Sequence, residues 1–142
     1  KVYRAAVIGL GVMGNIADGL GGRHPAWYRP CSHADAYEFH AHTELVAGST
    51  REPKRQALFR EKHPDKPVNA DYRQLLAHEE LDIVSIATPA TCHAEMVTAT
   101  AQAGVKGIYC EKAMATSLAT SMAPSIRTSS PRTNSPIPLN KS

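Results

Sequence analysis

The sequence predicts an α/β fold, a doubly wound parallel sheet with helices on both of its faces. Short apolar runs that suit buried parallel strands alternate with stretches typical of helices along the first 118 residues. One apolar run near the N-terminus breaks into regularly spaced glycines, which is typical of a strand that turns directly into a helix. The 142 residues, 42% of them hydrophobic, suffice for the core of one domain.

The first predicted strand, residues 2–8, ends in the spacing G-x-G-x-x-G. Gly9 permits a tight turn out of the strand, Gly11 lets the backbone approach a pyrophosphate, and Gly14 lets the next helix pack closely. After a strand, this spacing indicates a dinucleotide-binding Rossmann unit. The alternative interpretation is a strand–turn–helix corner that binds no ligand.

A helix is expected to begin near Val12 and to run toward Leu20. Its first N–H groups, around Val12 and Met13, would point at the phosphates together with the positive end of the helix dipole. Glycines and prolines then interrupt the helical pattern, so residues 21–31 predict a surface insertion.

The following segments alternate in type, which implies parallel strands joined by right-handed crossovers. The expected strands are residues 43–48, 68–70, 82–87 and 106–110. The expected helices are a short one through Ala34, Tyr37 and Phe39 with a Ser32 cap, residues 52–62, residues 72–78 with an Asp71 cap, and residues 91–103 ended by Gly104.

Two of these helices carry neighbouring apolar side chains. We expect Ala57, Leu58 and Phe59 on or near the inner face of one helix. We expect Leu75 and Leu76 to be buried by the other. Such an apolar face packed on a sheet supplies most of a helix's stability in a folded protein.

Composition and charge argue against several classes of protein. No run of about 18 apolar residues and no signal-peptide pattern is found, so no membrane partner is expected. The three cysteines are widely spaced, which fits reduced thiols in the cytoplasm, and no Cys or His spacing predicts a metal site. Residues 1–118 carry 13 basic and 13 acidic side chains, so no nucleic-acid partner is expected.

The pattern of strands and helices stops after residue 118. Residues 119–142 contain nine Ser or Thr and four Pro, and no hydrophobic period. Such a composition predicts a disordered tail. We therefore expect one dinucleotide-binding domain over residues 1–118 and a low-complexity tail over residues 119–142.

The residues after the second predicted strand bear on the choice of cofactor. A unit that prefers NAD places Asp or Glu there to bind the adenosine ribose, but this chain has Ser49, Thr50 and Arg51. Two hydroxyls and a guanidinium suit a phosphate dianion, so we expect NADP to be preferred, with NAD as the alternative. Glu52 follows one residue later. The alternative interpretation is a helix cap followed by a solvated arginine.

Three further segments carry a resemblance to a known family. They are Asp71-Tyr72-Arg73-Gln74-Leu75-Leu76, Ile86-Ala87-Thr88-Pro89-Ala90-Thr91-Cys92-His93-Ala94-Glu95 and Tyr109-Cys110-Glu111-Lys112-Ala113-Met114-Ala115. In this order they resemble the Gfo/Idh/MocA family, the relatives of glucose–fructose oxidoreductase and inositol dehydrogenase. The second is similar to the family's T-P-x-x-x-H-x-E segment and the third to its E-K-P motif. The resemblance covers about residues 3–118.

The resemblance implies where a cofactor would lie. Gly9, Gly11 and Gly14 would hold the pyrophosphate, and residues 49–51 would lie at the adenosine ribose. The nicotinamide ribose side would be lined by Thr88, Pro89 and His93, although a lone histidine at a helix start often only caps the helix.

The resemblance also implies a catalytic group. Glu111 and Lys112 match the first two residues of E-K-P, in which the lysine contacts cofactor and substrate and assists proton transfer. The alternative for Lys112 is an ordinary solvated charge. Ala113 stands where the family has proline, and Cys110 is expected to be a small core residue rather than a nucleophile.

By this resemblance the protein is expected to be an NAD(P)-dependent oxidoreductase of a sugar, cyclitol or related polyol. The alternative is a module that binds the dinucleotide without turnover. Relatives have a sixth strand and a large second domain, which nothing after Leu118 resembles, so we expect a chain truncated after the fifth strand. An uncovered sheet edge would favour self-association or a homo-oligomer.

Overall fold

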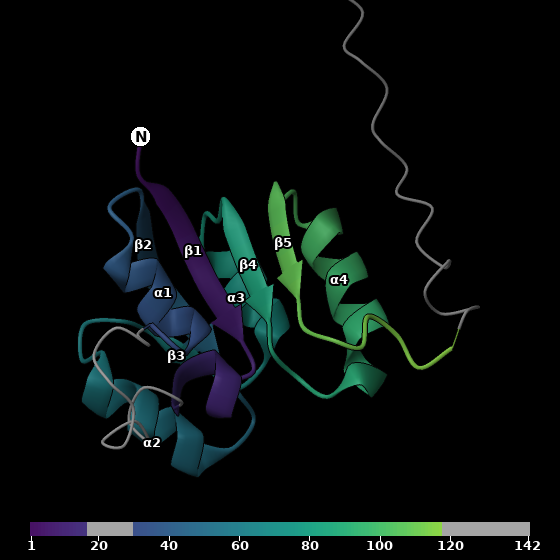
Figure 1. Cartoon of the computed structure of the whole chain (residues 1–142), viewed down its shortest axis with the longest axis horizontal. Coiled ribbons are helices and arrows are strands. Elements are labelled where there is room, and N and C mark those ends of the chain that lie inside the picture. The colour runs from purple at the N-terminus through teal and green to yellow at the C-terminus, as the bar shows by residue number, and fades with distance from the viewer. Residues whose placement is uncertain (17–29, 118–142) are drawn as a thin grey trace, which may run out of the picture.

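The structure, a computed structural model, describes residues 1–16 and 30–117. Within these residues five parallel strands form one sheet in the order β3-β2-β1-β4-β5 (Figure 1). The strands are β1 (Tyr3–Ile8), β2 (Thr43–Ser49), β3 (Val68–Asn69), β4 (Ile83–Ile86) and β5 (Gly107–Cys110). The predicted doubly wound parallel sheet is thereby confirmed. Three expectations lie outside the described residues: the second half of the helix expected from Val12 toward Leu20, most of the insertion over residues 21–31, and the tail over residues 119–142.

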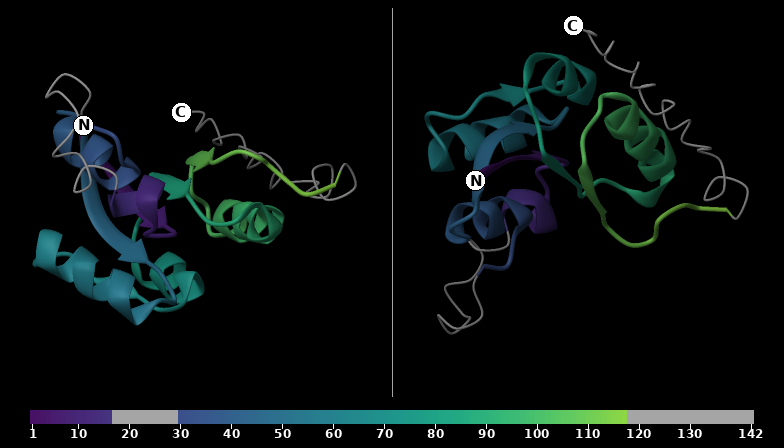
Figure 2. Two further views of the ribbon diagram at one scale, coloured as in Figure 1. Left: turned by 60° about the horizontal axis from the view of Figure 1, so that its bottom comes forward. Right: turned by 90° about the horizontal axis from the view of Figure 1, so that it is seen from above.

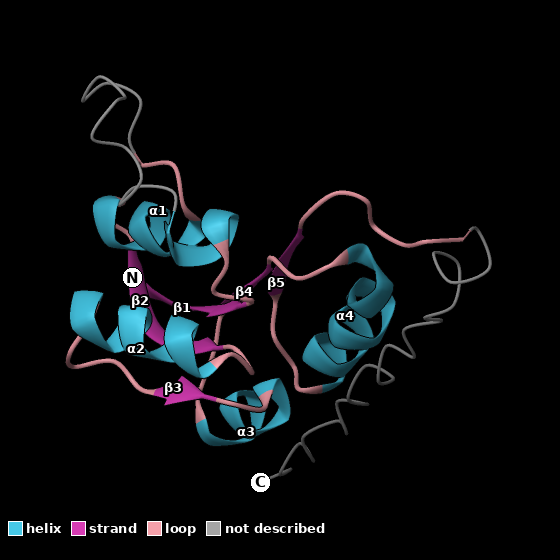
Figure 3. Ribbon diagram, turned by 90° about the horizontal axis from the view of Figure 1, so that it is seen from below, coloured by secondary structure: helices cyan, strands magenta, loops and turns pink. Residues whose placement is uncertain are grey.

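Helices cover both faces of this sheet. They are η1 (Val12–Ile16), α1 (His33–Phe39), α2 (Pro53–Lys62), α3 (Tyr72–His78), η3 (Ala90–Cys92) and α4 (His93–Gln102). Figure 3 shows α1 and α2 on one side of the sheet and α3 and α4 on the other, and in both views of Figure 2 α4 lies beside β4 and β5. None of the helices in the described part of the chain has the length and apolar character needed to span a membrane.

The alternation of side chains along β1 divides the core into two layers. Val7 packs in the cluster on the side of α1 and α2, whereas Ala6 and Ile8 pack in the cluster on the side of α3 and α4. Successive side chains of a strand point to opposite faces, so a strand buried on both faces has no polar side. This explains why the sequence of β1 is a continuous apolar run after Arg4.

Local side-chain chemistry sets several helix ends as the sequence predicted. The Ser32 hydroxyl accepts the backbone N–H of Asp35 at 3.3 Å, and the Asp71 carboxylate accepts that of Arg73 at 2.9 Å. These bonds satisfy N–H groups that have no partner within a helix. At the end of α4, Gly104 adopts φ +85°, the left-handed conformation that glycine tolerates best.

Fewer apolar side chains of α2 pack against the sheet than the sequence predicted. Phe59 is fully buried, but Ala57 and Leu58 are exposed, so the expectation for these two residues was wrong. Neighbouring residues of a helix point about 100° apart, and three in a row cannot all face the sheet. Phe59 fills the space left by a strand glycine: a Cβ added to Gly48 would lie 2.9 Å from its ring.

The other helices follow their predicted positions with small shifts. Leu75 is fully buried in the layer beneath α3 and α4, and Leu76 packs against that layer while only partly buried. The helix expected over residues 91–103 begins as the 3-10 turn η3, and α4 proper starts at His93.

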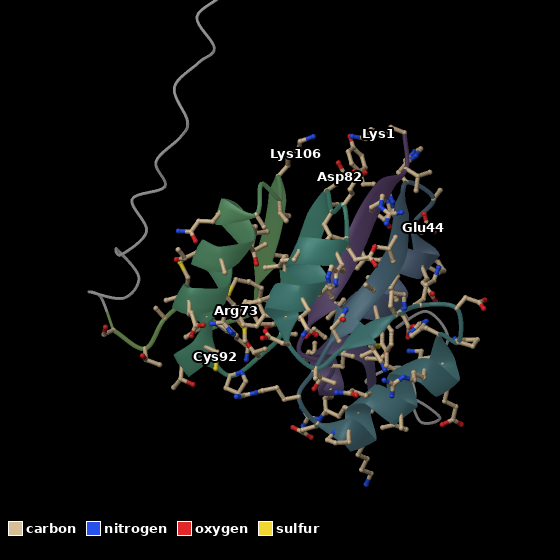
Figure 4. The ribbon with its side chains drawn as sticks, turned by 180° about the vertical axis from the view of Figure 1, so that it is seen from behind. Lys1, Glu44, Arg73, Asp82, Cys92 and Lys106 are labelled. Atoms are coloured by element: carbon tan, nitrogen blue, oxygen red, sulfur yellow. The ribbon has the colours of Figure 1, made fainter. Side chains whose placement is uncertain are left out.

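Charged groups interact at the amino ends of β1, β4 and β5. The Asp82 carboxylate accepts the backbone N–H of Arg4 at 3.1 Å and the Lys1 ammonium at 3.2 Å, and the Lys106 ammonium lies 4.0 Å away. The Arg4 hydrogen bond and the two lysines hold the pKa of Asp82 below its usual range. Figure 4 shows Lys1, Asp82 and Lys106 at one end of the sheet, with Cys92 toward the other.

The single anchor of α2 leads to a prediction about stability. Phe59→Ala is expected to lower the free energy of unfolding by about 3–5 kcal/mol, because a fully buried ring is replaced by a cavity. Leu58→Ala on the same helix is the matched control and should change it by no more than about 0.5 kcal/mol. Urea unfolding measures both, and equal losses would contradict the assignment of Phe59 as the anchor.

Candidate functional site

The carboxyl ends of four strands meet at one edge of the sheet (Figure 1). The N–H of Gly9 donates to the carbonyl of Ser49 in β2 at 2.8 Å, and the N–H of Ala87 donates to the last residue of β1 at 2.8 Å. The N–H of Glu111 donates to the last residue of β4 at 3.0 Å. The turns after β1, β4 and β5 are therefore neighbours. The strand order reverses between β1 and β4, which is where ligands bind in open α/β sheets.

At two positions of the turn after β1, no residue other than glycine fits. Gly9 adopts φ +95°, and a Cβ added to it would lie 2.5 Å from the carbonyl oxygen of Ala87. A Cβ added to Gly14 would lie 1.8 Å from the carbonyl oxygen of Gly9 itself. The first glycine is thus required by the neighbouring β4 turn and the last by the close approach of η1 to the strand.

The start of η1 offers backbone N–H groups beside this turn. The N–H groups of Asn15 and Ile16 donate to the carbonyl of Gly11 at 3.0 and 3.1 Å. The preceding N–H groups of a helix have no partner within it, and Val12 and Met13 are exposed. This arrangement fits a pyrophosphate, because the free N–H donors and the positive end of the helix dipole lie together beside the glycine turn.

Arg55 is a residue of this site that the sequence analysis missed. A Cβ added to Gly11 would lie 3.2 Å from the Arg55 guanidinium, so the guanidinium lies directly over the glycine turn. Its Nε also contacts the Glu52 carboxylate at 2.9 Å. The signal that could have revealed it is its place three residues after Glu52, the spacing at which opposite charges pair at the start of a helix.

The end of β2 differs in part from the expectation. Ser49 is buried, whereas Arg51 is exposed and forms no ion pair with the residues that the structure describes. The Thr50 N–H donates to the carbonyl of Asn69 at 3.0 Å, and its hydroxyl accepts the N–H of Glu52 at 3.4 Å. Thr50 therefore helps to start α2, and Arg51 is the side chain most open to a ligand here.

The turn after β4 is held by a buried histidine. His93 is fully buried, with Nε2 2.7 Å from the carbonyl oxygen of Thr88 and Nδ1 2.7 Å from the carbonyl oxygen of Ala113. Pro89 follows Thr88 and precedes the first residue of η3. Contact of His93 with a cofactor stays a prediction, while its contact with the backbone of two turns is a feature of the structure.

The turn after β5 carries the predicted catalytic lysine. Lys112 is exposed, and its N–H donates to the Glu111 carboxylate at 3.3 Å. The other carboxylate oxygen of Glu111 lies 3.0 Å from Nε2 of His33, the first residue of α1. This hydrogen bond is the main reason that the pKa of Glu111 lies below its usual range. No sequence pattern marks His33, because its partner is far along the chain.

Cys110, the last residue of β5, fits the expectation of a core residue. It packs against the buried layer beneath α3 and α4. Burial raises the pKa of its thiol, which disfavours the thiolate that a nucleophile requires.

A second cluster of polar side chains lies between α1 and α2. Asp35, Glu38 and His63 bring ligand atoms within 4.8 Å of one another. The Lys62 ammonium lies 2.6 Å from the Asp35 carboxylate and donates to the carbonyl of Asn15 at 3.0 Å. The lysine thus supplies positive charge beside these acids, and the cluster joins η1 to both helices.

Comparison with known proteins agrees with this geometry. A sequence model of the oxidoreductase family with an NAD-binding Rossmann fold, GFO_IDH_MocA, matches residues 3–124. The chain is 32% identical over 77 residues to the uncharacterized oxidoreductase YrbE of Bacillus subtilis. The aligned segment covers 54% of this chain and 22% of that protein.

Solved structures that share the fold include two with a bound nicotinamide coenzyme. One is an oxidoreductase from Agrobacterium radiobacter in complex with NAD+, L-tartaric acid and magnesium, at 25% identity and a TM-score of 0.65. The other is the WlbA dehydrogenase from Chromobacterium violaceum in complex with NADH and UDP-GlcNAcA, at 26% identity and a TM-score of 0.65. Each match covers 84% of this chain and 30% of the other, so the chain spans less than a third of these relatives. The family match over most of its length shows that the chain belongs to the Gfo/Idh/MocA oxidoreductase family.

Proposed function

We propose that residues 1–118 form the cofactor-binding domain of an oxidoreductase that prefers NADP and acts on a sugar, cyclitol or related polyol. The observation that carries the proposal is the glycine turn at the point where the strand order reverses. Its Gly14 lies so close to the Gly9 carbonyl that no side chain fits, which brings the start of η1 against the end of β1. That close approach suits the binding of a diphosphate.

The remaining cofactor contacts follow from the neighbouring turns. The diphosphate would lie against Gly9, Gly11 and Gly14 and the N–H groups around Val12 and Met13. The adenosine would extend toward the end of β2, and the nicotinamide toward the turns after β4 and β5. Thr88, Pro89 and His93 belong to the first of these two turns, and Glu111 and Lys112 belong to the second.

The charges at the end of β2 support a preference for NADP. The first carboxylate after the strand, Glu52, is paired with Arg55 at 2.9 Å, which reduces its repulsion of a phosphate. Arg51 is exposed nearby, and Arg55 reaches over Gly11. Two guanidinium groups with hydroxyls beside them favour a phosphate dianion over a bare ribose. The two solved relatives described above hold NAD+ and NADH, respectively.

The chemistry of Lys112 supports a role in proton transfer. A bound nicotinamide would accept or supply the hydride, and the substrate hydroxyl must then lose or gain a proton. The Lys112 ammonium makes no ion pair within the described part of the chain, so it is available to a substrate oxygen. Its position at the carboxyl end of β5 is where α/β enzymes build their sites.

A binding module without turnover is the second candidate. The chain spans less than a third of the solved relatives, so turnover by the whole protein is a proposal and binding without turnover is its alternative. A cytoplasmic location and self-association stay predictions.

The glycine turn gives the first test of this proposal. Gly14→Ala is expected to weaken NADPH binding by about tenfold or more, because its Cβ would displace the Gly9 carbonyl or η1. Gly107→Ala is the control, since its Cβ would lie 3.4 Å from Ile83, an ordinary contact. NADPH fluorescence measures binding and circular dichroism verifies folding. Unchanged affinity in a folded Gly14→Ala variant would overturn the proposal.

Arg51 gives a test of cofactor choice. Arg51→Ala is expected to weaken NADPH binding by about 10- to 100-fold, the loss of about 1.5–3 kcal/mol for a hydrogen bond to a charged group, and to leave NADH binding nearly unchanged. Arg60→Ala, an exposed arginine farther along α2, serves as the control. Calorimetric titration with both coenzymes measures the difference. Equal losses for the two coenzymes would remove the argument for NADP.

Turnover separates the two candidates. Wild-type protein is assayed at the nicotinamide absorbance band with NADP+ and a panel of polyols and sugars. Lys112→Ala should lower the rate by about 10²–10⁴-fold because the proton transfer is lost, and should weaken NADPH binding by a much smaller factor. Binding without turnover by the wild-type chain would favour the binding module.

A further inference from the structure

The His93 ring joins two turns that come from different strands. Its Nε2 meets the Thr88 carbonyl in the turn after β4, and its Nδ1 meets the Ala113 carbonyl in the turn after β5, both at 2.7 Å. The ring is fully buried. A carbonyl oxygen can only accept. A neutral imidazole carries one N–H and donates to one of the two carbonyls, whereas an imidazolium donates to both. A carbonyl that loses such a donor must bond water or another group instead.

The segment beyond β5 is linked to the sheet through Glu111 and to α4 through the His93 ring. The last backbone bond from this segment to the sheet is the one from Glu111 to the end of β4. In the described residues, no backbone–backbone hydrogen bond ties residues 112–116 to another element. The Ala113 carbonyl, one residue past Lys112, is instead held by His93.

A second histidine holds the residue on the other side of Lys112. His33 of α1 contacts the Glu111 carboxylate at 3.0 Å, and its ring lies 5.0 Å from that of Tyr109. Lys112 is therefore flanked by one residue held through its side chain and one held through its backbone. The two histidines come from helices on opposite faces of the sheet.

We infer that His93 is a positioning residue: by joining the Thr88 and Ala113 carbonyls it fixes the turn that presents Lys112 to the site. This inference rests on the proposed function for the role of Lys112 but not for the coupling of the two turns. The coupling is a property of the protein without cofactor. It can be measured separately from binding.

The experiment compares the backbone order of residues 111–114 in three variants by ¹⁵N relaxation. In wild type and in the control Thr100→Val, which changes another fully buried polar residue of α4, order parameters near about 0.85 are expected. In His93→Phe, which keeps a buried ring without donors, they should fall below about 0.6. His93→Gln, whose amide nitrogen carries two N–H groups, should recover much of the order.

Two results would overturn the inference: order in His93→Phe equal to wild type, or an equal loss in Thr100→Val. Should His93→Phe not fold, wild-type spectra decide, because a ring N–H of His93 must show a nuclear Overhauser contact to Ala113. Absence of that contact overturns the inference as well. NADPH titration of the wild type is run in parallel, and a failure to bind would overturn the proposed function while the order parameters still judge His93.

Discussion

The parallel pairing of β1 with β2 on one side and β4 on the other is the constraint on which the rest of the structure depends. It places Gly9 beside Ser49 and Ala87 beside the end of β1, so that the turns leaving these strands share one edge. The glycine at each end of the motif then follows from contact with a neighbouring carbonyl. The geometry of the glycine turn is thus a product of sheet register as much as of the glycines.

Much of this fold could be predicted from sequence because its signals are local. The apolar run of β1, the Ser32 and Asp71 caps and the glycine after α4 each act over a few residues, and the structure contains all of them. The face of α2 could not be predicted from three adjacent apolar residues. Phe59 is the one that packs on the sheet, because its ring fills the space beside Gly48. Gly48 lies in β2, and the sequence of α2 alone does not show this contact.

The candidate site divides in the same way. Residues marked by a motif, such as Gly9 and Lys112, were predicted from sequence. Arg55 and His33 were missed because their partners, Gly11 and Glu111, are 44 and 78 residues away, respectively. Such contacts arise from the crossing of elements and leave no periodicity in the chain. His93 was predicted to lie in the site, but its two carbonyl partners become visible only when both turns are placed.

The charged cluster around Asp82 has a consequence of a different kind. It lies at the amino ends of β1, β4 and β5, about 20 Å from the turns at their other ends given the rise of a six-residue strand. Substitutions at Lys1 or Lys106 therefore change the charge around Asp82 while leaving the turns after β1, β4 and β5 in place.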